Sequence, residues 1–322
     1  MRPAASVSID LDELWAYRRS FGLPHEDGAS LLPTALPRFM HFMQRHGLKG
    51  TAFVVGRDAL RAEVQPLLRE LSIKGHELGN HSFDHAGDIE AWPISRQQED
   101  LQRAHEAIVA AAGAGAAPLG FRAPSFRVSP TLLSAVQMMG YAYDSSSFPS
   151  RLGALSRRWQ QRRARSLGQK IELPADAHGH AARALPLVPH HWSLSSSPDR
   201  ALVEVPITTL PGLRVPLHGT YLQHLADFSP ALARTYARAA MAWCATAKVA
   251  PHLLLHATDF IGADDGLPCG FLPGMRRPWR DKVALLDVAI TAMKARFTPM
   301  PLIDCVRQLP PDLKTLVPEA RP

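Results

Sequence analysis

Two short segments of the sequence combine residue types that hold a divalent metal at a catalytic centre. The segment SIDLD ends an apolar run and carries Asp10 and Asp12, which point to the same side of an extended backbone. The segment GNHSFDH carries His81 and His85, whose imidazoles would share a face on one helical turn. Two neutral imidazoles and one carboxylate leave a zinc-type ion with open positions for water and substrate.

Two further segments supply an arginine and a histidine at the ends of apolar runs. In GFRAPS, Arg122 can pair with a carboxylate, orient it and set its pKa. In LLLH, His256 ends a fully apolar run, where a half-buried imidazole can act as a general acid.

Each of these features has a simpler explanation when it is taken alone. The aspartates could cap a helix or lie in a solvated loop, and a histidine pair can arise by chance in a chain with 15 histidines. Arg122 could form a surface ion pair, and His256 could be a core residue. Four polar groups at four strand ends would nevertheless meet at one mouth of a parallel barrel, which favours a catalytic site.

Short apolar, β-branched runs alternate with segments of helical period, as in successive βα units around a parallel sheet. The predicted strands are Val7–Asp10, Thr51–Val55, Glu77–Asn80, Leu119–Arg122, Tyr141–Asp144, Leu202–Pro206, His252–His256 and Pro301–Ile303. The predicted helices are Ser30–His46, Arg57–Lys74, Ser95–Ala112, Ser129–Met139, Ser229–Lys248 and Pro278–Arg296. Eight strands are a barrel-like number, so we expect an α/β fold.

The length and composition indicate an ordinary globular protein, with 322 residues of which 46% are hydrophobic and 20% charged. We expect one domain over residues 1–310 and a C-terminal tail over 311–322. The cysteines are too far apart for a zinc ribbon or a redox pair; they are Cys244, Cys269 and Cys305. Because the first ten residues lack a signal-peptide run and no run is long enough to span a membrane, we expect a cytoplasmic protein.

Residues 149–229 interrupt the alternation, since they are rich in Pro, His, Ser and Arg and contain one convincing strand. Such an insertion either shapes the substrate site or decorates the surface. The formal charge of +7 is concentrated here, because five arginines lie between Arg151 and Lys170 without an acidic residue. With Trp159 and several leucines among them, they predict a basic amphipathic helix that lies on an anionic membrane, or a solvated helix over the barrel.

The order and spacing of these motifs resemble the polysaccharide deacetylases, the NodB-homology or carbohydrate esterase family 4 enzymes, in their Asp-x-Asp subset. The resemblance extends from Val7 to about Leu302 and includes the tract TAFVVG that begins at Thr51. It implies a distorted (β/α) barrel of seven or eight parallel strands with an irregular insertion. It also implies removal of an acyl group, usually acetyl, from an N-acylated sugar.

The resemblance further implies roles for individual residues. Asp10 falls on the catalytic base, Arg122 on the arginine that braces it, and His256 on the histidine acid. The implied ligands of a divalent metal, expected to be zinc, are Asp12, His81 and His85. Because Leu11 separates the two aspartates, their roles could be exchanged.

Other positions depart from the commonest family pattern. Ser125 replaces a frequent tyrosine, so any substrate contact made by the tyrosine side chain is lost. Ser125 is still a candidate substrate-binding residue, because the metal and a backbone N–H near Ser125 are expected to hold the oxyanion. The acidic residue that tunes the histidine acid is expected to be Asp144, with Asp259 as the alternative. Trp192 and His190, within the insertion, are candidate sugar contacts.

These inferences predict a metal-dependent hydrolase that removes an N-acyl group from a sugar or glycan precursor, with metal-activated water as nucleophile. The preferred acyl group is acetyl. A deformylase or other amidase that acts on a lipid-linked amino sugar or a small cyclic amide is the alternative. A non-catalytic glycan-binding protein is a third class. We expect a glycan partner, with membrane contact through residues 151–170, and no nucleic acid.

Overall fold

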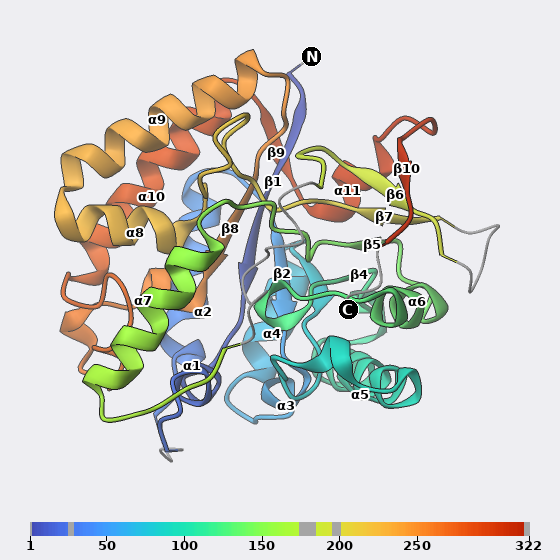
Figure 1. The fold of residues 1–322 in the computed structure, drawn as a ribbon, viewed down its shortest axis with the longest axis horizontal. Helices are drawn as coiled ribbons and strands as arrows, with labels where there is room; N and C mark the ends of the chain where they lie inside the picture. The colour runs from blue at the N-terminus through green and yellow to red at the C-terminus, as the bar shows by residue number, and fades with distance from the viewer. Residues whose placement is uncertain (1, 25–28, 174–184, 195–200, 319–322) are drawn as a thin grey trace.

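One sheet lies at the centre of the molecule in the computed structural model, which describes residues 2–24, 29–173, 185–194 and 201–318 (Figure 1). Its strands are β1 (Ala4–Asp10), β2 (Thr51–Val54), β3 (Glu77–Asn80), β4 (Gly120–Phe121), β5 (Tyr143–Asp144), β6 (His190–Trp192), β7 (Leu202–Glu204), β8 (His252–His256), β9 (Thr298–Met300) and β10 (Thr315–Leu316). They run in the order β10-β6-β7-β5-β4-β3-β2-β1-β8, and β9 pairs with β1.

The pairing of these strands confirms the predicted distorted barrel of parallel strands. Strands β1 to β5, β7, β8 and β9 are joined by parallel pairs, whereas β6 runs antiparallel to β7. In parallel barrels the carboxyl ends of the strands form the mouth at which functional groups gather. The four strands β1, β3, β4 and β8 therefore bring the predicted site residues to the same end of the sheet.

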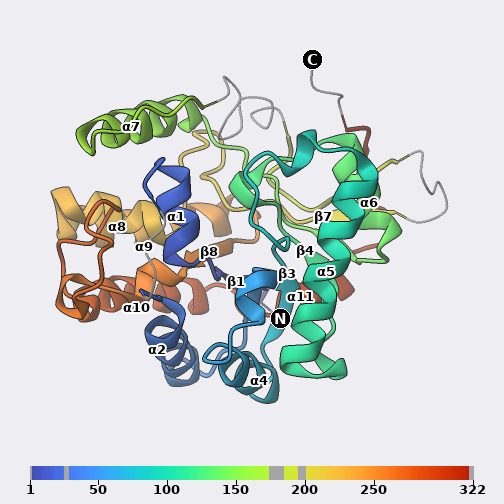
Figure 2. The ribbon, with the colours of Figure 1, turned by 90° about the horizontal axis from the view of Figure 1, so that it is seen from below.

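The helices cover the outside of the sheet (Figures 1 and 2). They are α1 (Leu14–Ser20), α2 (Leu32–Arg45), α3 (Gly56–Ala59), α4 (Gln65–Ile73), α5 (Ile94–Ala112), α6 (Pro130–Met138), α7 (Gly153–Ser166), α8 (Gly219–Phe228), α9 (Pro230–Thr246), α10 (Trp279–Lys294) and α11 (Leu302–Arg307). Among the residues that the structure describes, none of the helices is long and apolar enough to cross a bilayer.

Strand β1 shows how the sequence builds a barrel with a polar interior. Val7 and Ile9 are fully buried in the main hydrophobic core with the surrounding helices. The alternate residues Ser8 and Asp10 point the other way, because side chains of a strand alternate between its faces, and both accept hydrogen bonds from Arg122. The strand is therefore buried on both faces, one apolar and one polar.

Glycines in the neighbouring strands make room for aromatic rings inside the barrel. A Cβ atom on Gly79 would lie 2.6 Å from the ring of Phe53, and one on Gly120 would lie 2.0 Å from the ring of Tyr143. The buried Tyr143 hydroxyl donates a hydrogen bond of 2.7 Å to Glu77. The small residues thus position aromatic rings under the mouth of the barrel.

Two predicted elements differ from the structure. Residues 301–303 were predicted as a strand, but β9 ends at Met300, because Pro301 has no N–H for the ladder and instead precedes α11. The single helix predicted over Arg57–Lys74 is wrong as well. It is divided into α3 and α4, because residues 60–64 form turns closed by hydrogen bonds such as that from Val64 N–H to the Arg61 carbonyl.

The insertion at 149–229 contains α7, β6, β7 and α8, and so more regular structure than predicted. The segment after β7 bridges two sides of the barrel. Val205 N–H donates to the Asp144 carbonyl, and the His252 N–H at the start of β8 donates to the Thr208 hydroxyl at 2.5 Å. Residues 315–316, within the predicted tail, form β10 and pair with β6.

Replacement of Gly120 by alanine should lower the free energy of unfolding by about 1–3 kcal/mol, because the new methyl group overlaps the packed ring of Tyr143. Gly115→Ala is the matched control, since nothing lies within 4 Å of a Cβ atom there. Urea or thermal unfolding measures both changes. Equal stability of the two variants would contradict the close packing of β4 against Tyr143.

Candidate active site

Asp12, His81 and His85 converge at the carboxyl ends of β1 and β3. One ligand atom from each lies within 4.8 Å of the others. Asp12 Oδ1 is 3.3 Å from His81 Nε2 and 3.2 Å from His85 Nε2. The structure thereby brings together the three residues predicted to bind a metal.

A loop, and not the predicted helical turn, presents the two imidazoles. Ser82 and His85 have φ of 63° and 47°, in the left-handed region that is unfavourable for residues with a Cβ atom. The loop is held by side chains from elsewhere. Asn80 Oδ1 accepts from the Ser82 N–H at 2.8 Å, and Asp100 Oδ1 accepts from the Phe83 N–H at 2.8 Å.

The donor atoms of this triad fit a divalent cation. His81 Nδ1 lies 2.6 Å from the Arg122 carbonyl, which requires the proton on Nδ1 and leaves the Nε2 lone pair directed toward Asp12. Asp12 Oδ1 is buried and, among the described residues, accepts no well-formed hydrogen bond. Burial alone would raise the pKa of Asp12, but attraction to His85 and His81 in their protonated forms outweighs burial and holds the pKa well below its usual range.

Asp10 and Arg122 form a buried ion pair beside the triad. The side chains are 1% and 0% exposed, and Arg122 Nη1 donates to Asp10 Oδ1 at 2.6 Å. The remaining donors of the guanidinium reach Ser8 Oγ, the Ser145 carbonyl and Ser145 Oγ. Asp10 Oδ2 is left facing His81 Nε2 at 3.9 Å.

His256 approaches the same oxygen from β8. Its Nε2 lies 4.0 Å from Asp10 Oδ2, and its side chain is 13% exposed. Nδ1 is 3.1 Å from the hydroxyl of Thr220, at the start of α8. Asp259, a predicted tuning residue, accepts instead from the backbone N–H of His256 at 2.9 Å. Its buried carboxylate is accommodated because residue 219 is glycine, where a Cβ atom would lie 2.1 Å from Asp259 Oδ2.

Asp144 and Trp192 occupy places that differ from those predicted. Asp144 accepts from the Ser146 hydroxyl at 2.6 Å and lies beside Glu204, not beside Nδ1 of His256. Burial raises the pKa of both carboxyl groups, and the charge of Asp144 raises that of Glu204 further. Trp192 is 3% exposed and donates its indole N–H to Glu204, and His190 is also buried, so both lie in the core rather than on a sugar-binding surface.

A cavity of about 510 Å³ opens beside the triad. Its walls include His85 from the metal triad and Ser125, the residue predicted to contact the substrate. Gln160 and Ile171 reach it from the insertion, and Arg19 from α1. The insertion therefore forms part of the wall next to the candidate site.

Several residues at the site were not singled out from the sequence. Trp15 lies with its ring perpendicular to that of His85, at a centroid distance of 6.4 Å. The Tyr17 hydroxyl is buried, and after burial the charge of Asp12 contributes most to raising its pKa well above the usual range. Both residues lie on α1, directly after Asp12, so their nearness to that aspartate was the available signal.

Comparisons with known proteins agree with the fold. Residues 17–143 match the family model described as polysaccharide deacetylase; this range includes His81, His85 and Arg122 and excludes Asp10, Asp12 and His256. The uncharacterized protein YlxY of Bacillus subtilis is 33% identical over 107 residues, which are 33% of this chain and 32% of that protein. The match thus spans about a third of the length of this curated relative.

Among solved structures, a proposed polysaccharide deacetylase from Mycobacterium smegmatis is 19% identical, with 100% of this chain and 94% of that chain covered and a TM-score of 0.59. This likeness shows the fold. A family 4 carbohydrate esterase pseudoenzyme from Bacillus anthracis is 12% identical, with 99% of this chain and 70% of that chain covered and a TM-score of 0.49.

The geometry of the triad predicts a single zinc-type site. Zinc-loaded protein should retain about one ion per chain after dialysis, and His85→Ala should weaken binding at least about tenfold, because one of three ligands is lost. His41→Ala, on the exposed face of α2, is the control and should keep the ion. Metal analysis by mass spectrometry measures the content. Full zinc retention by His85→Ala would contradict the site.

Proposed function

We propose that the chain is a member of the polysaccharide deacetylase family, whose model matches residues 17–143, and that it is a metal-dependent hydrolase that removes an N-acyl group from a sugar. The observation that carries this proposal is the position of Asp10 Oδ2. It faces the metal histidine His81 at 3.9 Å and the candidate acid His256 at 4.0 Å, while Arg122 holds the other oxygen. The candidate base Asp10 therefore lies between the metal site and the candidate acid His256.

Asp10 acts as the base because its two oxygens have different surroundings. The guanidinium of Arg122 binds Oδ1 and holds the carboxylate in one orientation. Oδ2 is left to take the proton of the attacking water. When bound to Asp12, His81 and His85, a divalent metal, which we propose to be zinc, supplies a lowered pKa of water and polarisation of the acyl carbonyl.

His256 acts as the acid that protonates the leaving amine. The Thr220 hydroxyl at Nδ1 orients the ring so that Nε2 faces the reaction centre. Asp259 fixes the backbone of His256 through its N–H. We propose that Thr220 is a positioning residue for the acid, and that the backbone near Ser125 contributes to the oxyanion site.

The proposed substrate is an N-acetylated sugar in a lipid-linked precursor, with a formylated sugar as the alternative. The surface of the basic helix α7 supports a lipid-linked substrate. Arg158 and Arg162 are exposed on α7, whereas Trp159 packs against Phe21 and His224 with ring centroids 6.2 Å and 6.0 Å away. Protein therefore covers Trp159, whereas Leu155 on the same helix is 62% exposed, and together with Arg158 and Arg162 it can face an anionic surface. Identifying the released acid as acetate or formate distinguishes the two candidate substrates.

Asp10→Asn should lower acetate release from N-acetylglucosamine oligomers at least about a hundredfold, because the base is lost. Its zinc content should stay at the wild-type level, because Asp10 is not a ligand. Acetate assay and metal analysis on the same preparation measure both. Asp304→Asn, an exposed carboxylate on α11, is the control with unchanged activity. An active Asp10→Asn enzyme would exclude Asp10 as the base.

Thr220→Val should lower kcat about tenfold with little change in KM, because the imidazole of His256 loses the contact that orients it. Thr220→Ser keeps the hydroxyl and should restore most of the activity. Thr246→Val, exposed on α9, is the matched control. If the serine variant is as slow as the valine variant, the hydroxyl contact is not what positions the acid.

A further inference from the structure

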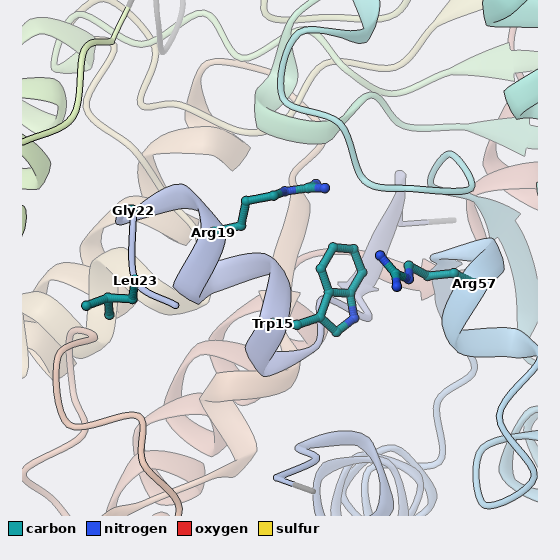
Figure 3. Close-up of a pocket in the computed structure, with 5 residues that line it drawn as sticks. All are labelled: Trp15, Arg19, Gly22, Leu23 and Arg57. Carbon is teal, nitrogen blue, oxygen red and sulfur yellow. The ribbon is translucent and has the colours of Figure 1, made fainter. Parts of the chain in front are cut away.

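A second cavity lies along α1 (Figure 3). Its volume is about 400 Å³, and its walls are Trp15, Arg19, Gly22, Leu23 and Arg57. The ring of Trp15 meets that of His85 edge to face at a centroid distance of 6.4 Å, so one wall of the cavity packs against a residue of the triad. Arg19 lines both cavities, so the two share a wall.

Two guanidinium groups meet at the indole of Trp15. Figure 3 shows Arg19 from α1 and Arg57 from α3 directed toward the ring, and their Cζ atoms lie 4.9 Å and 4.4 Å from its centroid. The indole is itself held in place, since its Nε1–H donates to both oxygens of Asp58 at 3.0 Å and 3.1 Å. The ring therefore holds two cations in a defined arrangement.

Carboxylates compensate part of the charge of these arginines, because Asp84 and Asp88 attract Arg19 and Asp58 attracts Arg57. Arg57 lies 3.9 Å from Asp84, and the two side chains are 47% and 43% exposed. Arg19 donates to the backbone carbonyls of Asp84, at 2.8 Å, and His85. Both guanidinium groups lie within 5 Å of the same indole centroid, so the two cations repel each other.

We propose that this cavity is an anion subsite that takes a phosphate or carboxylate group carried by the sugar substrate. An oxyanion between Arg19 and Arg57 removes their repulsion and accepts charge-assisted hydrogen bonds from both. The N-acyl group of the same sugar then lies toward His85 and the triad. The inference rests on the proposed function and narrows its substrate to acidic N-acylated sugars.

A neutral sugar stacked on Trp15 is the competing occupant. The guanidinium groups already lie within 5 Å of the ring centroid, which leaves less of the indole for a pyranose face. A stacked neutral sugar also does nothing to reduce the repulsion between the guanidinium groups of Arg19 and Arg57. The anionic occupant is therefore favoured by both contact and charge.

Direct binding to the metal-loaded protein tests the subsite without turnover. Calorimetry compares N-acetylglucosamine with N-acetylglucosamine 1-phosphate, the phosphate arm, and with N-acetylmuramic acid, the carboxylate arm. At least one acidic sugar should bind about tenfold or more tightly than the neutral sugar, as expected for charge-assisted hydrogen bonds. Equal binding of all three sugars overturns the proposal.

Substitutions at Arg57 assign the preference to this cavity. Arg57→Gln should abolish the preference for the acidic sugar, Arg57→Lys should keep part of it, and Arg234→Gln, exposed on α9, should leave it unchanged. Arg57 is half exposed, so its variants should fold, which thermal unfolding checks. A preference that survives in Arg57→Gln overturns the subsite. If the wild-type protein releases no acetate but still binds the acidic sugar more tightly than the neutral one, the proposed hydrolase activity is refuted and the subsite is supported.

Discussion

The buried ion pair between Asp10 and Arg122 is the interaction on which the rest of the site depends. Both charges are removed from water, and breaking such a pair costs about 3–5 kcal/mol, because the remaining charge is uncompensated. Arg122 also binds Ser8 on β1 and Ser145 after β5, and its carbonyl accepts the Nδ1 proton of His81. One residue thereby connects the candidate base, a candidate metal ligand and three segments of the barrel.

The sequence predicted the parts of the fold that have a local signal. Strands β1, β2, β3 and β8 lie within a few residues of their predicted bounds, because they are apolar or β-branched runs that end at polar residues. The loop from His81 to His85 was misread as a helical turn. Its left-handed backbone is held by the carboxylate of Asp100, which is far from it in the sequence, and no local pattern reports such a contact.

In the candidate site, too, the sequence predicted the residues that have a local signal and not the contacts between distant segments. Asp12 and the two histidines meet as predicted, because parallel strand ends share one mouth. The partner of His256 was not predictable, since Thr220 lies in a stretch without a clear pattern and reaches β8 only through the path of the insertion. Asp144 was assigned to that role, but it stands opposite Glu204 in the register of β5 and β7, and strand register between distant segments is a tertiary property.

The backbone of His85 has a consequence for how a metal is retained. A residue with a Cβ atom in the left-handed region costs about 1–2 kcal/mol, which the loop must recover from its contacts. A cation that binds the imidazole supplies part of this energy, so loop order and ion affinity are linked quantities. Asp100, which is no ligand, then belongs to the energetics of the metal through the two N–H groups that it binds. The affinity of the candidate site for a cation thus depends in part on the folded backbone of this loop.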